Sequence, residues 1–495
     1  MDSFSTSMKA AVLACGLLAA SHAPEALSQT RTIGMYYALW HCPSKAGTYN
    51  LTDILESDNP TGFGPVGAFH WWGKPKDGYY CLSENEALLE QHATQLKAAG
   101  IDFVYVDVTN WVDLVASDRA QEMVVRPFDT LLRVWARMSA AGKAVPEVAP
   151  WVRVSPETMT LPNKDMIEHL RSKMVGSPVA KTYANKPVVF IAPYEYPKGH
   201  PRAGQLEYPA AKLSQYASSL YLVNMWTGTL GEWKFIAPCF DQNDFKTRRA
   251  IRDCNQTGSA DGLEISVSPA FASNWMSYAP TAVPKFHGAT FLQQMETARR
   301  SYRPYIMITG WNEWVVQRVT WEGHTEALFT DQYDQEYNRD LEPASRSGDL
   351  YYQLLKRSIE ELRGDRSVTA VAGNPGSIRG VFDGVYGNRV NGWACSYGWA
   401  LPIDVRVTVG GPPGIGTSIG SFSADYSKAD ASAVAGQCGT TGPAYRFEIP
   451  LSLAMRQRHR GKRIYIQGIH PTGTYVNSLL ANSGAADVKY LVPAP

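Results

Sequence analysis

The sequence predicts an α/β protein, with a (β/α)8 barrel of the TIM type followed by an all-β sandwich domain. From about residue 32 to 365, short β-rich apolar runs alternate with helical patterns, which is the rhythm of a parallel sheet. The length of this region suits an eight-stranded barrel. Beyond residue 377, short strands are separated by Gly, Pro and Asn turns, as in a β-sandwich.

The predicted barrel strands are short apolar runs bounded by turn residues. Seven segments fit this description: Ile33–Leu39, Phe103–Val108, Glu147–Trp151, Pro187–Ala192, Leu220–Met225, Leu263–Val267 and Tyr305–Ile308. Trp233–Ala237 is a candidate for the eighth strand, although it follows Met225 too closely for a crossover helix. We therefore expect a barrel with one irregular strand rather than an open sheet.

Helical patterns lie between these strands. They cover Glu84–Ala99, Pro127–Ala141, Lys164–Met174, Tyr208–Ser219 and Val283–Tyr302, and Asp349–Leu362 closes the series. Residues 366–377 are rich in Gly, Ala and Ser and are interpreted as a linker. The sandwich domain is assigned to residues 378–495, with strands at Ile378–Val381, Arg389–Ala394, Ile403–Val409, Arg446–Ile449 and Ile464–Ile469.

The N-terminus has the pattern of an export signal, which we assign to residues 1–28. Lys9 precedes an apolar run from Ala10 to Ala20, far below the roughly 20 residues that a membrane span needs. No later segment is apolar enough to span a bilayer, so we expect a secreted or periplasmic protein. The formal net charge of +1, without basic or acidic blocks, argues against nucleic acid or an anionic membrane as a partner.

Cysteine usage agrees with export. Without the signal, an even number of cysteines remains, which predicts disulfide bonds in an oxidising compartment. Pairing of nearest neighbours is the simplest connectivity. No pair has the spacing of a zinc site and none lies beside an activating His, which disfavours metal binding or catalysis by these thiols. The six residues are Cys42, Cys81, Cys239, Cys254, Cys395 and Cys438.

The segment Thr309–Trp314, with the sequence TGWNEW, is the most informative stretch for function. It follows the predicted strand Tyr305–Ile308, and catalytic groups collect where the strands of parallel barrels end. Glu313 could act as acid, base or nucleophile at a glycosidic bond, while the flanking indoles could stack on sugars. A carboxylate buried between two indoles costs stability unless it is paired, which favours a functional role for Glu313.

Aromatic and acidic residues also recur at the ends of the other predicted strands. Asp107 is the first candidate for a second catalytic carboxylate, followed by Glu195 and Glu264. Each has a structural alternative: Asp107 could cap the following helix, Glu195 could be a solvated loop charge, and Glu264 could face the helix layer. The residues expected to line the sugar subsites are Tyr37, His41, Trp151, Tyr194, Trp226, Trp311, Asn312 and Trp314.

Five segments carry a resemblance to a known family: Trp311–Trp314, Leu341–Pro343, Asp349–Tyr352, Gly34–Tyr37 and Tyr105–Asp107. Together they resemble the bacterial glycoside hydrolase family 99-like group, which is related to the endo-α-mannosidases. The resemblance covers about residues 32 to 365 and implies a (β/α)8 barrel that hydrolyses a glycosidic bond with retention, using carboxylates.

The chain departs from this family at one position. In the endo-mannosidases a second acidic residue follows the Glu of the tetrapeptide by three positions, and here that position is Val316. Two carboxylates are needed, about 5 Å apart for retention or roughly 6.5–9.5 Å apart for inversion. The partner of Glu313 must therefore come from another strand.

A second acidic cluster spans residues 331–342. Its acids offer the hard oxygen ligands that suit Ca²⁺, but it lacks the Gly and the ligand spacing of an EF-hand loop. We therefore predict no cofactor and expect the loop to fold over the site, with Tyr333 or Tyr337 contacting sugar and Arg339 pairing with an acid. Its remaining acids, Glu336, Asp340 and Glu342, are reserve candidates for the second carboxylate.

The leading interpretation is an exported glycoside hydrolase acting on a polysaccharide or oligosaccharide. The alternative, favoured by Val316, is a secreted carbohydrate-binding protein with a degenerate, non-catalytic barrel. A metal-dependent deacetylase or lyase is disfavoured because the His residues form no ligand pair. In the sandwich domain, Trp393, Tyr397 and Trp399 cluster around Cys395, either as a platform for a polysaccharide or as core packed against a disulfide.

Overall fold

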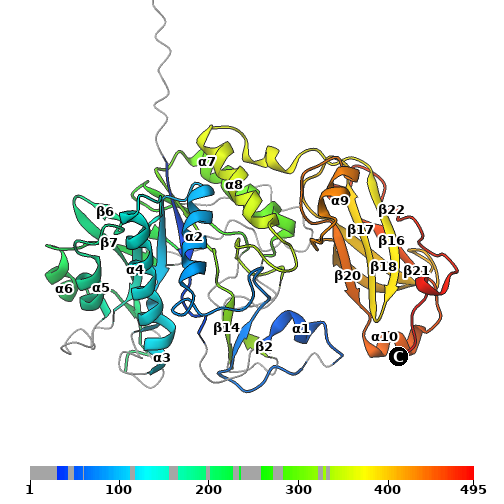
Figure 1. Ribbon diagram of the computed structural model, residues 1–495, viewed down its shortest axis with the longest axis horizontal. Helices are drawn as coiled ribbons and strands as arrows, with labels where there is room; N and C mark the ends of the chain where they lie inside the picture. Colours follow the sequence, from blue (N-terminus) through cyan, green and yellow to red (C-terminus); the bar gives the residue numbers. More distant parts are fainter. Residues whose placement is uncertain are drawn as a thin grey trace, which may run out of the picture.

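The barrel and the C-terminal β domain lie at the two ends of an elongated molecule (Figure 1). The computed structural model describes residues 31–42, 49–58, 61–111, 118–154, 166–196, 201–203, 205–226, 233–235, 258–270, 283–320, 327–329 and 335–495. Within these ranges, no helix is long and apolar enough to cross a membrane.

Eight of the described strands form the parallel wall of the barrel. In sheet order they run β11-β10-β7-β5-β4-β1-β13-β12, and every neighbouring pair is parallel. The predicted fold class is confirmed. The strands are β1 (Thr32–Tyr37), β4 (Phe103–Asp107), β5 (Glu147–Arg153), β7 (Lys186–Ala192), β10 (Tyr221–Trp226), β11 (Trp233–Lys234), β12 (Glu264–Val267) and β13 (Tyr305–Ile308).

Side chains join the two ends of this sheet, β11 and β12. The backbone N–H of Lys234 donates to Glu264 Oε2 at 3.1 Å, and Ser266 Oγ donates to the Lys234 carbonyl at 2.9 Å. The predicted eighth strand is therefore confirmed as β11, although it is only two residues long. Residues 236 and 237 of the predicted segment lie outside the described residues.

Helices cover the outside of the barrel and connect its strands. The larger ones are α2 (Glu86–Ala98), α4 (Arg126–Ala140), α5 (Met166–Met174), α7 (Ala289–Ser301) and α8 (Leu350–Arg363). The predicted helix Tyr208–Ser219 is shorter in the structure, where α6 (Ala210–Leu213) continues into a 3-10 turn, Ser214–Tyr216. Two further short helices are α1 (Leu51–Leu55) and α3 (Asp118–Ala120).

Small additional sheets surround the barrel. One has the order β15-β14-β3-β2 and includes the segment just after Glu313. Its strands are β2 (Tyr49–Asn50), β3 (Phe69–Trp71), β14 (Val315–Val319) and β15 (Leu328–Phe329). β6 (Thr182–Tyr183) pairs with β7, and β8 (Tyr194–Glu195) pairs with β9 (Leu206–Glu207).

The core has two layers because side chains alternate along each strand. On β1, Tyr36 points into the barrel among Tyr105, Trp151 and Phe235. Tyr37 points outward to the helices, where its hydroxyl lies 2.7 Å from Nδ1 of His92. This alternation decides which aromatic residues lie inside the barrel and which face the helices.

The C-terminal domain packs two antiparallel sheets face to face. One sheet has the order β16-β17-β20 and the other β19-β18-β21-β22, and a shared apolar core lies between them. The structure adds two strands, β19 and β22, that the sequence pattern does not predict. The bounds are β16 (Ile378–Tyr386), β17 (Arg389–Ser396), β18 (Asp404–Val409), β19 (Thr417–Ser423), β20 (Arg446–Pro450), β21 (Ile464–Gly468) and β22 (Ser478–Leu479), with helices α9 (Ala431–Gln437) and α10 (Leu453–His459).

The segment between the two parts, predicted as a linker, contains a 3-10 turn, Val368–Ala372, that packs into the barrel core. Ion pairs also join the two parts. Arg346, just before α8, pairs with Asp425 at 2.9 Å and with Glu56 at 3.2 Å. Arg389 on β17 pairs with the same Glu56 at 2.9 Å.

Two of the three nearest-neighbour disulfides are present in the described residues. Cys42 is bonded to Cys81, and Cys395 to Cys438, with Cα–Cα distances of 4.6 and 6.0 Å. These two predicted pairings are confirmed. Cys239 and Cys254 lie outside the described residues.

Candidate active site

Hydrogen bonds to β1 fix the turn that carries Glu313. After β13, Gly310 adopts a positive φ of 118°, and the N–H of Trp311 donates to the Tyr36 carbonyl at 3.0 Å. The Asn312 side chain accepts from the Ala38 N–H at 2.8 Å and donates to the Ala38 carbonyl at 3.2 Å. The turn therefore folds back over the carboxyl end of β1.

Two carboxylates meet at the Tyr36 hydroxyl at this end of the barrel. The Tyr36 oxygen lies 2.8 Å from Asp107 Oδ2 and 3.3 Å from Glu313 Oε1. Because the two oxygens share one phenol neighbour, they are at most about 6 Å apart. The structure thus brings Glu313 together with Asp107, the first of the predicted partners.

A buried cation and a buried acid support Glu313. Arg339 Nη2 lies 2.8 Å from Glu313 Oε2, with 1% of the Arg339 side chain and 13% of the Glu313 side chain exposed. The backbone N–H of Glu313 donates to Asp340 Oδ1 at 2.5 Å, and Trp72 Nε1 donates to Asp340 Oδ2 at 2.6 Å. An ion pair of this kind favours the anionic form of a carboxylate.

The electrostatic surroundings of Asp107 are different. Burial raises the pKa of Asp107, and hydrogen bonds from Thr109 and Tyr36 oppose that rise only in part. The N–H of Thr109 donates to Asp107 Oδ1 at 2.8 Å. Asp107 therefore holds its proton to higher pH than an ordinary aspartic acid, beside a carboxylate that is paired with Arg339.

Asp340 is buried beneath the site. Burial raises the pKa of Asp340 to about 7, against the opposing charge of Lys285. Lys285 Nζ donates to the Asp340 carbonyl at 2.8 Å and to the Asn338 side chain. The Asp340 carboxylate accepts hydrogen bonds from the Glu313 N–H and the Trp72 indole. Asp340 therefore fixes the backbone of the Glu313 turn.

The two indoles beside Glu313 lie in the core. Trp311 and Trp314 have no exposed surface, so a sugar cannot stack on either ring in this conformation. Trp314 stacks on Trp72 with ring centroids 4.3 Å apart, and its Nε1 donates to Glu342 Oε2 at 2.5 Å. Glu342 also accepts from Tyr80 at 2.9 Å and so is occupied by a buried network.

Three other predicted sugar contacts are buried in supporting positions. Tyr37 lies in the helix-facing layer, as described above. His41 Nε2 lies 2.7 Å from the Asn312 carbonyl, and burial lowers the pKa of His41 to about 3, which keeps the ring neutral. Asn312 is fully buried and bonded to Ala38. These residues position the turn rather than face an open pocket.

The remaining predicted aromatics lie nearer the barrel opening. Trp151 is inside the barrel, with its ring centroid 4.4 Å from that of Phe235 and 6.0 Å from that of Trp226. Trp226 ends β10 and keeps part of its surface exposed. Tyr194 on β8 is buried against Tyr196 at 5.2 Å.

The other two candidate carboxylates lie elsewhere. Glu264 is the first residue of β12 and pairs in register with Tyr305, so it lies at the amino end of the barrel, opposite the Glu313 turn. Burial raises the pKa of Glu264 to about 7. Glu195 lies in the β8–β9 hairpin, and its side chain is outside the described residues.

Val316 occupies the position where the family pattern has its second acid. It lies on β14, is buried, and pairs in register with His70 of β3. The apolar side chain of Val316 therefore supplies no carboxylate at this position.

Tyr36 was not identified from the sequence as a site residue. The contacts of Arg339 and Asp340 with Glu313 were not predicted from it either. The signal for Tyr36 was the alternation of β1: if Met35 and Tyr37 face the helices, Tyr36 must face the barrel interior. The pairing of Arg339 with an acid was expected, but its partner was not. Residues 331–334 of the acidic cluster lie outside the described residues, and Glu336 accepts from the Phe286 N–H at 2.8 Å.

In the described part of the chain, no group of three or more His, Cys, Asp or Glu side chains is arranged to hold a metal ion.

Comparisons with known proteins give structural neighbours only. No protein-family model matches the chain, and no curated protein matches it. Among solved structures, the chain is similar to a GH99 endo-α-mannosidase from Bacteroides thetaiotaomicron, with a TM-score of 0.39 and 13% identity, covering 68% of this chain and 98% of that one. It is also similar to a glycoside hydrolase-like protein, with a TM-score of 0.37 and 13% identity. That match covers 66% of this chain and 94% of the other. The fold assignment rests on the strand pairing given above.

Proposed function

We propose that this protein is a secreted glycoside hydrolase whose barrel cleaves glycosidic bonds with the carboxylate pair Glu313 and Asp107. The observation that carries the proposal is their convergence on one phenol oxygen, that of Tyr36, at the carboxyl end of the barrel. Catalytic groups gather at this end in parallel barrels. A pair of carboxylates is the standard apparatus of glycoside hydrolysis.

The pair is close enough for hydrolysis with retention of configuration. The two oxygens beside the Tyr36 hydroxyl lie at most about 6 Å apart, which allows the separation of about 5–5.5 Å that a retaining enzyme needs between its carboxyl groups. Retention is also what the family resemblance implies, and one carboxylate then attacks the anomeric carbon directly.

The environments of the two carboxyl groups suggest their roles. Glu313 is held beside the Arg339 guanidinium, which favours the charged form needed by a nucleophile. Asp107 has a pKa raised by burial, which suits a general acid. Asp107 would protonate the leaving oxygen while Glu313 attacks the anomeric carbon. Asp107 would then accept a proton from the water that hydrolyses the glycosyl ester.

The polysaccharide or oligosaccharide substrate would lie at the mouth of the barrel. Trp226 has exposed surface there and contacts the barrel interior through Trp151. The two disulfides support the view that the protein works in an oxidising compartment outside the cytoplasm.

The test is a screen for sugar release from bacterial, fungal and plant polysaccharides. Wild type is compared with Glu313→Gln, Asp107→Asn and the matched control Glu264→Gln, which makes the same change at the opposite end of the barrel. We expect wild type and Glu264→Gln to release sugar, with or without EDTA. The other two variants should lose activity at least about 1,000-fold. Normal release by Glu313→Gln would contradict the proposal.

A second candidate function is non-catalytic carbohydrate binding by the barrel. The observation in its favour is Val316, which is buried where the family pattern has an acid. The same proteins separate the two functions. If no polysaccharide is hydrolysed but an oligosaccharide slows amide exchange in the barrel strands of wild type and Glu313→Gln equally, binding without catalysis is the better description.

A further inference from the structure

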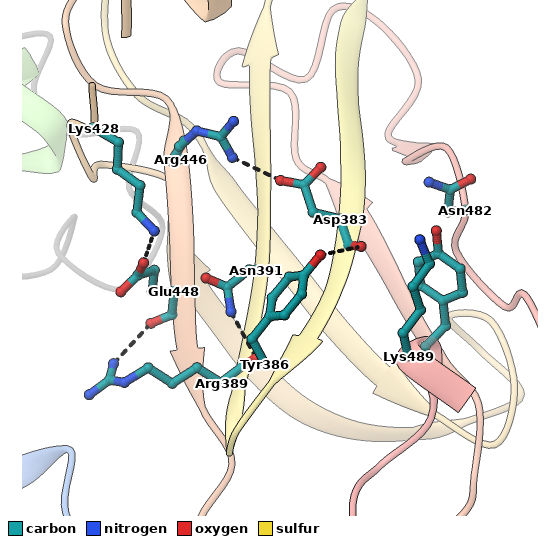
Figure 2. A pocket seen from close by; sticks show the side chains of 10 residues that line it. Asp383, Tyr386, Arg389, Asn391, Lys428, Arg446, Glu448, Asn482 and Lys489 are labelled. Atoms are coloured by element: carbon teal, nitrogen blue, oxygen red, sulfur yellow. Dashed lines mark hydrogen bonds and ion pairs between the residues drawn. The ribbon is translucent and has the colours of Figure 1, made fainter. Parts of the chain in front are cut away.

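The C-terminal domain has an open groove on the outer face of its three-stranded sheet. Residues alternate on these strands, so that Phe382, Val390 and Phe447 enter the core while Asp383, Asn391 and Arg446 face outward. Figure 2 shows the outward side chains arrayed across β16, β17 and β20. The cavity has a volume of about 690 Å³ and is lined by Asp383, Tyr386, Arg389, Asn391, Lys428, Arg446, Glu448, Asn482, Lys489 and Tyr490.

Ion pairs hold the charged side chains of the groove in place. Arg446 Nη1 lies 2.8 Å from Asp383 Oδ2, and its Nε donates to Asp430 at 2.8 Å. Lys428 pairs with Glu448, and Arg389 pairs with Glu56. A ligand would therefore meet groups that are already oriented, which lowers the entropic cost of binding.

The same pairs leave the groove close to electrically neutral. Asp383 and Glu448 are each matched by a cation, and among the described lining residues only Lys489 is left without an acidic partner within ion-pair distance. An anionic polymer would need several uncompensated cations. The lining has no aliphatic side chain, so it does not suit an apolar peptide either.

The groove instead offers what sugar hydroxyls require. Carboxylate, amide and guanidinium groups that face outward together can both accept and donate hydrogen bonds, and each sugar hydroxyl does both. Tyr386 stands at the edge of the groove with 60% of its surface exposed. Its hydroxyl donates to the Asp383 carbonyl at 3.4 Å, and an aromatic face held in this way can stack on a sugar ring.

We propose that this groove binds a neutral oligosaccharide segment as a non-catalytic site, separate from the barrel. The assignment differs from the aromatic platform considered from sequence. Trp393 packs beside the Cys395–Cys438 disulfide, and Trp399 packs against the cores of the barrel and of the sandwich. The Arg379 guanidinium lies over the Tyr397 ring, 3.9 Å from its centroid. These rings do not form one open surface, whereas the groove is open.

Binding is tested on full-length Glu313→Gln protein, so that turnover cannot remove the polymer. Affinity electrophoresis uses gels that contain yeast mannan, galactomannan, xyloglucan or polygalacturonate. We expect at least one of the three neutral polymers to retard the protein. In the Glu313→Gln background, Tyr386→Ala should weaken that binding about five- to tenfold. The matched control Tyr475→Ala, which removes another largely exposed Tyr elsewhere in the domain, should not.

Hydrogen exchange then locates the site independently of catalysis. Oligosaccharides of the retarding polymer should slow amide exchange in β16, β17 and β20 of the full chain. The proposal is overturned if no neutral polymer retards the protein, or if polygalacturonate alone does. It is also overturned if Tyr386→Ala binds like its parent, or if protection is confined to the barrel. None of these outcomes depends on whether the barrel hydrolyses a sugar.

Discussion

Tyr36 connects the two carboxylates at the carboxyl end of the barrel. Its hydroxyl lies 2.8 Å from Asp107 and 3.3 Å from Glu313, in a position with almost no exposure to solvent. A hydrogen bond to a charged group contributes about 1.5–3 kcal/mol. Hydrogen bonds of this strength from the Tyr36 hydroxyl are enough to fix the spacing of the two carboxylates and to influence the pKa of Asp107.

Tyr36→Phe should lower turnover about 10- to 100-fold and move its pH dependence. Without the hydroxyl, the Asp107 carboxylate loses a hydrogen bond that lowers its pKa. The pKa of Asp107 should therefore rise further. A general acid must be protonated, so the alkaline limb of the pH profile of kcat should shift to higher pH. The measurement is kcat against pH on the substrate found by the screen.

Tyr105→Phe is the matched control for this experiment. The Tyr105 hydroxyl is also inside the barrel, but it donates to the Ile308 carbonyl at 2.9 Å rather than to a carboxylate. This variant should lose stability without shifting the pH profile. An equal shift in both variants would mean that Tyr36 does not act on Asp107.

At the scale of elements, the turn after β13 sets the direction of Glu313. Gly310 has a φ of 118°, and a Cβ at this residue would overlap the carbonyl group of Arg339. The turn and the segment that holds Arg339 are therefore in backbone contact. Glycine allows the close approach that aligns Glu313 with its buried cation.

Gly310→Ala should destabilise the protein by about 2–4 kcal/mol and sharply reduce turnover, because it forces apart the segments that carry Glu313 and Arg339. The control is Gly142→Ala, where φ is 74° but no atom lies within 4 Å of the added Cβ. This substitution should lower the free energy of unfolding only by the strain of a positive φ, about 1 kcal/mol, and should leave turnover unchanged. Denaturant unfolding and kcat provide the measurements. Equal losses in both variants would contradict the role of the Arg339 contact.

The elements were easier to predict from sequence than the contacts between them. Apolar runs and helical periods identified seven strands and the sandwich, because burial imposes those patterns directly. Tyr37 was predicted as a sugar contact, but its neighbour Tyr36 is the residue that faces the barrel interior. Adjacent residues of a strand point to opposite faces, so an error of one position places the side chain on the wrong side of the sheet. Trp311 and Trp314 looked like sugar platforms, yet both are buried by partners distant in sequence, such as Trp72. No local pattern encodes such partners.

On the scale of the whole molecule, ion pairs tie the barrel to the sandwich. His287, at the start of the α7 region, pairs with Asp404 on β18 at 3.1 Å. Burial by itself would lower the pKa of His287. The hydrogen bond and charge of Asp404, with smaller effects of Glu336 and Asp425, outweigh it and raise the pKa to about 9.

This pair makes a contribution to stability that should depend on pH. The folded pKa of about 9 lies above the ordinary value of 6.5. The contribution is therefore complete below about pH 6.5 and is lost as the pH rises through 9. It amounts to at most about 3 kcal/mol. Wild type should lose Tm between pH 7 and pH 9.5 more steeply than Asp404→Asn does. Parallel curves would show that the pair does not contribute.

The measurement that tests the central claim most directly is azide rescue of alanine variants, with an aryl glycoside of the sugar that the screen identifies. A small anion can replace a missing carboxylate in a retaining hydrolase. Azide should restore turnover to Asp107→Ala and give a glycosyl azide of retained configuration. With Glu313→Ala it should give the inverted azide. Failure to rescue either folded variant, or rescue of Glu264→Ala instead, would contradict the assignment of Glu313 and Asp107 as the catalytic pair.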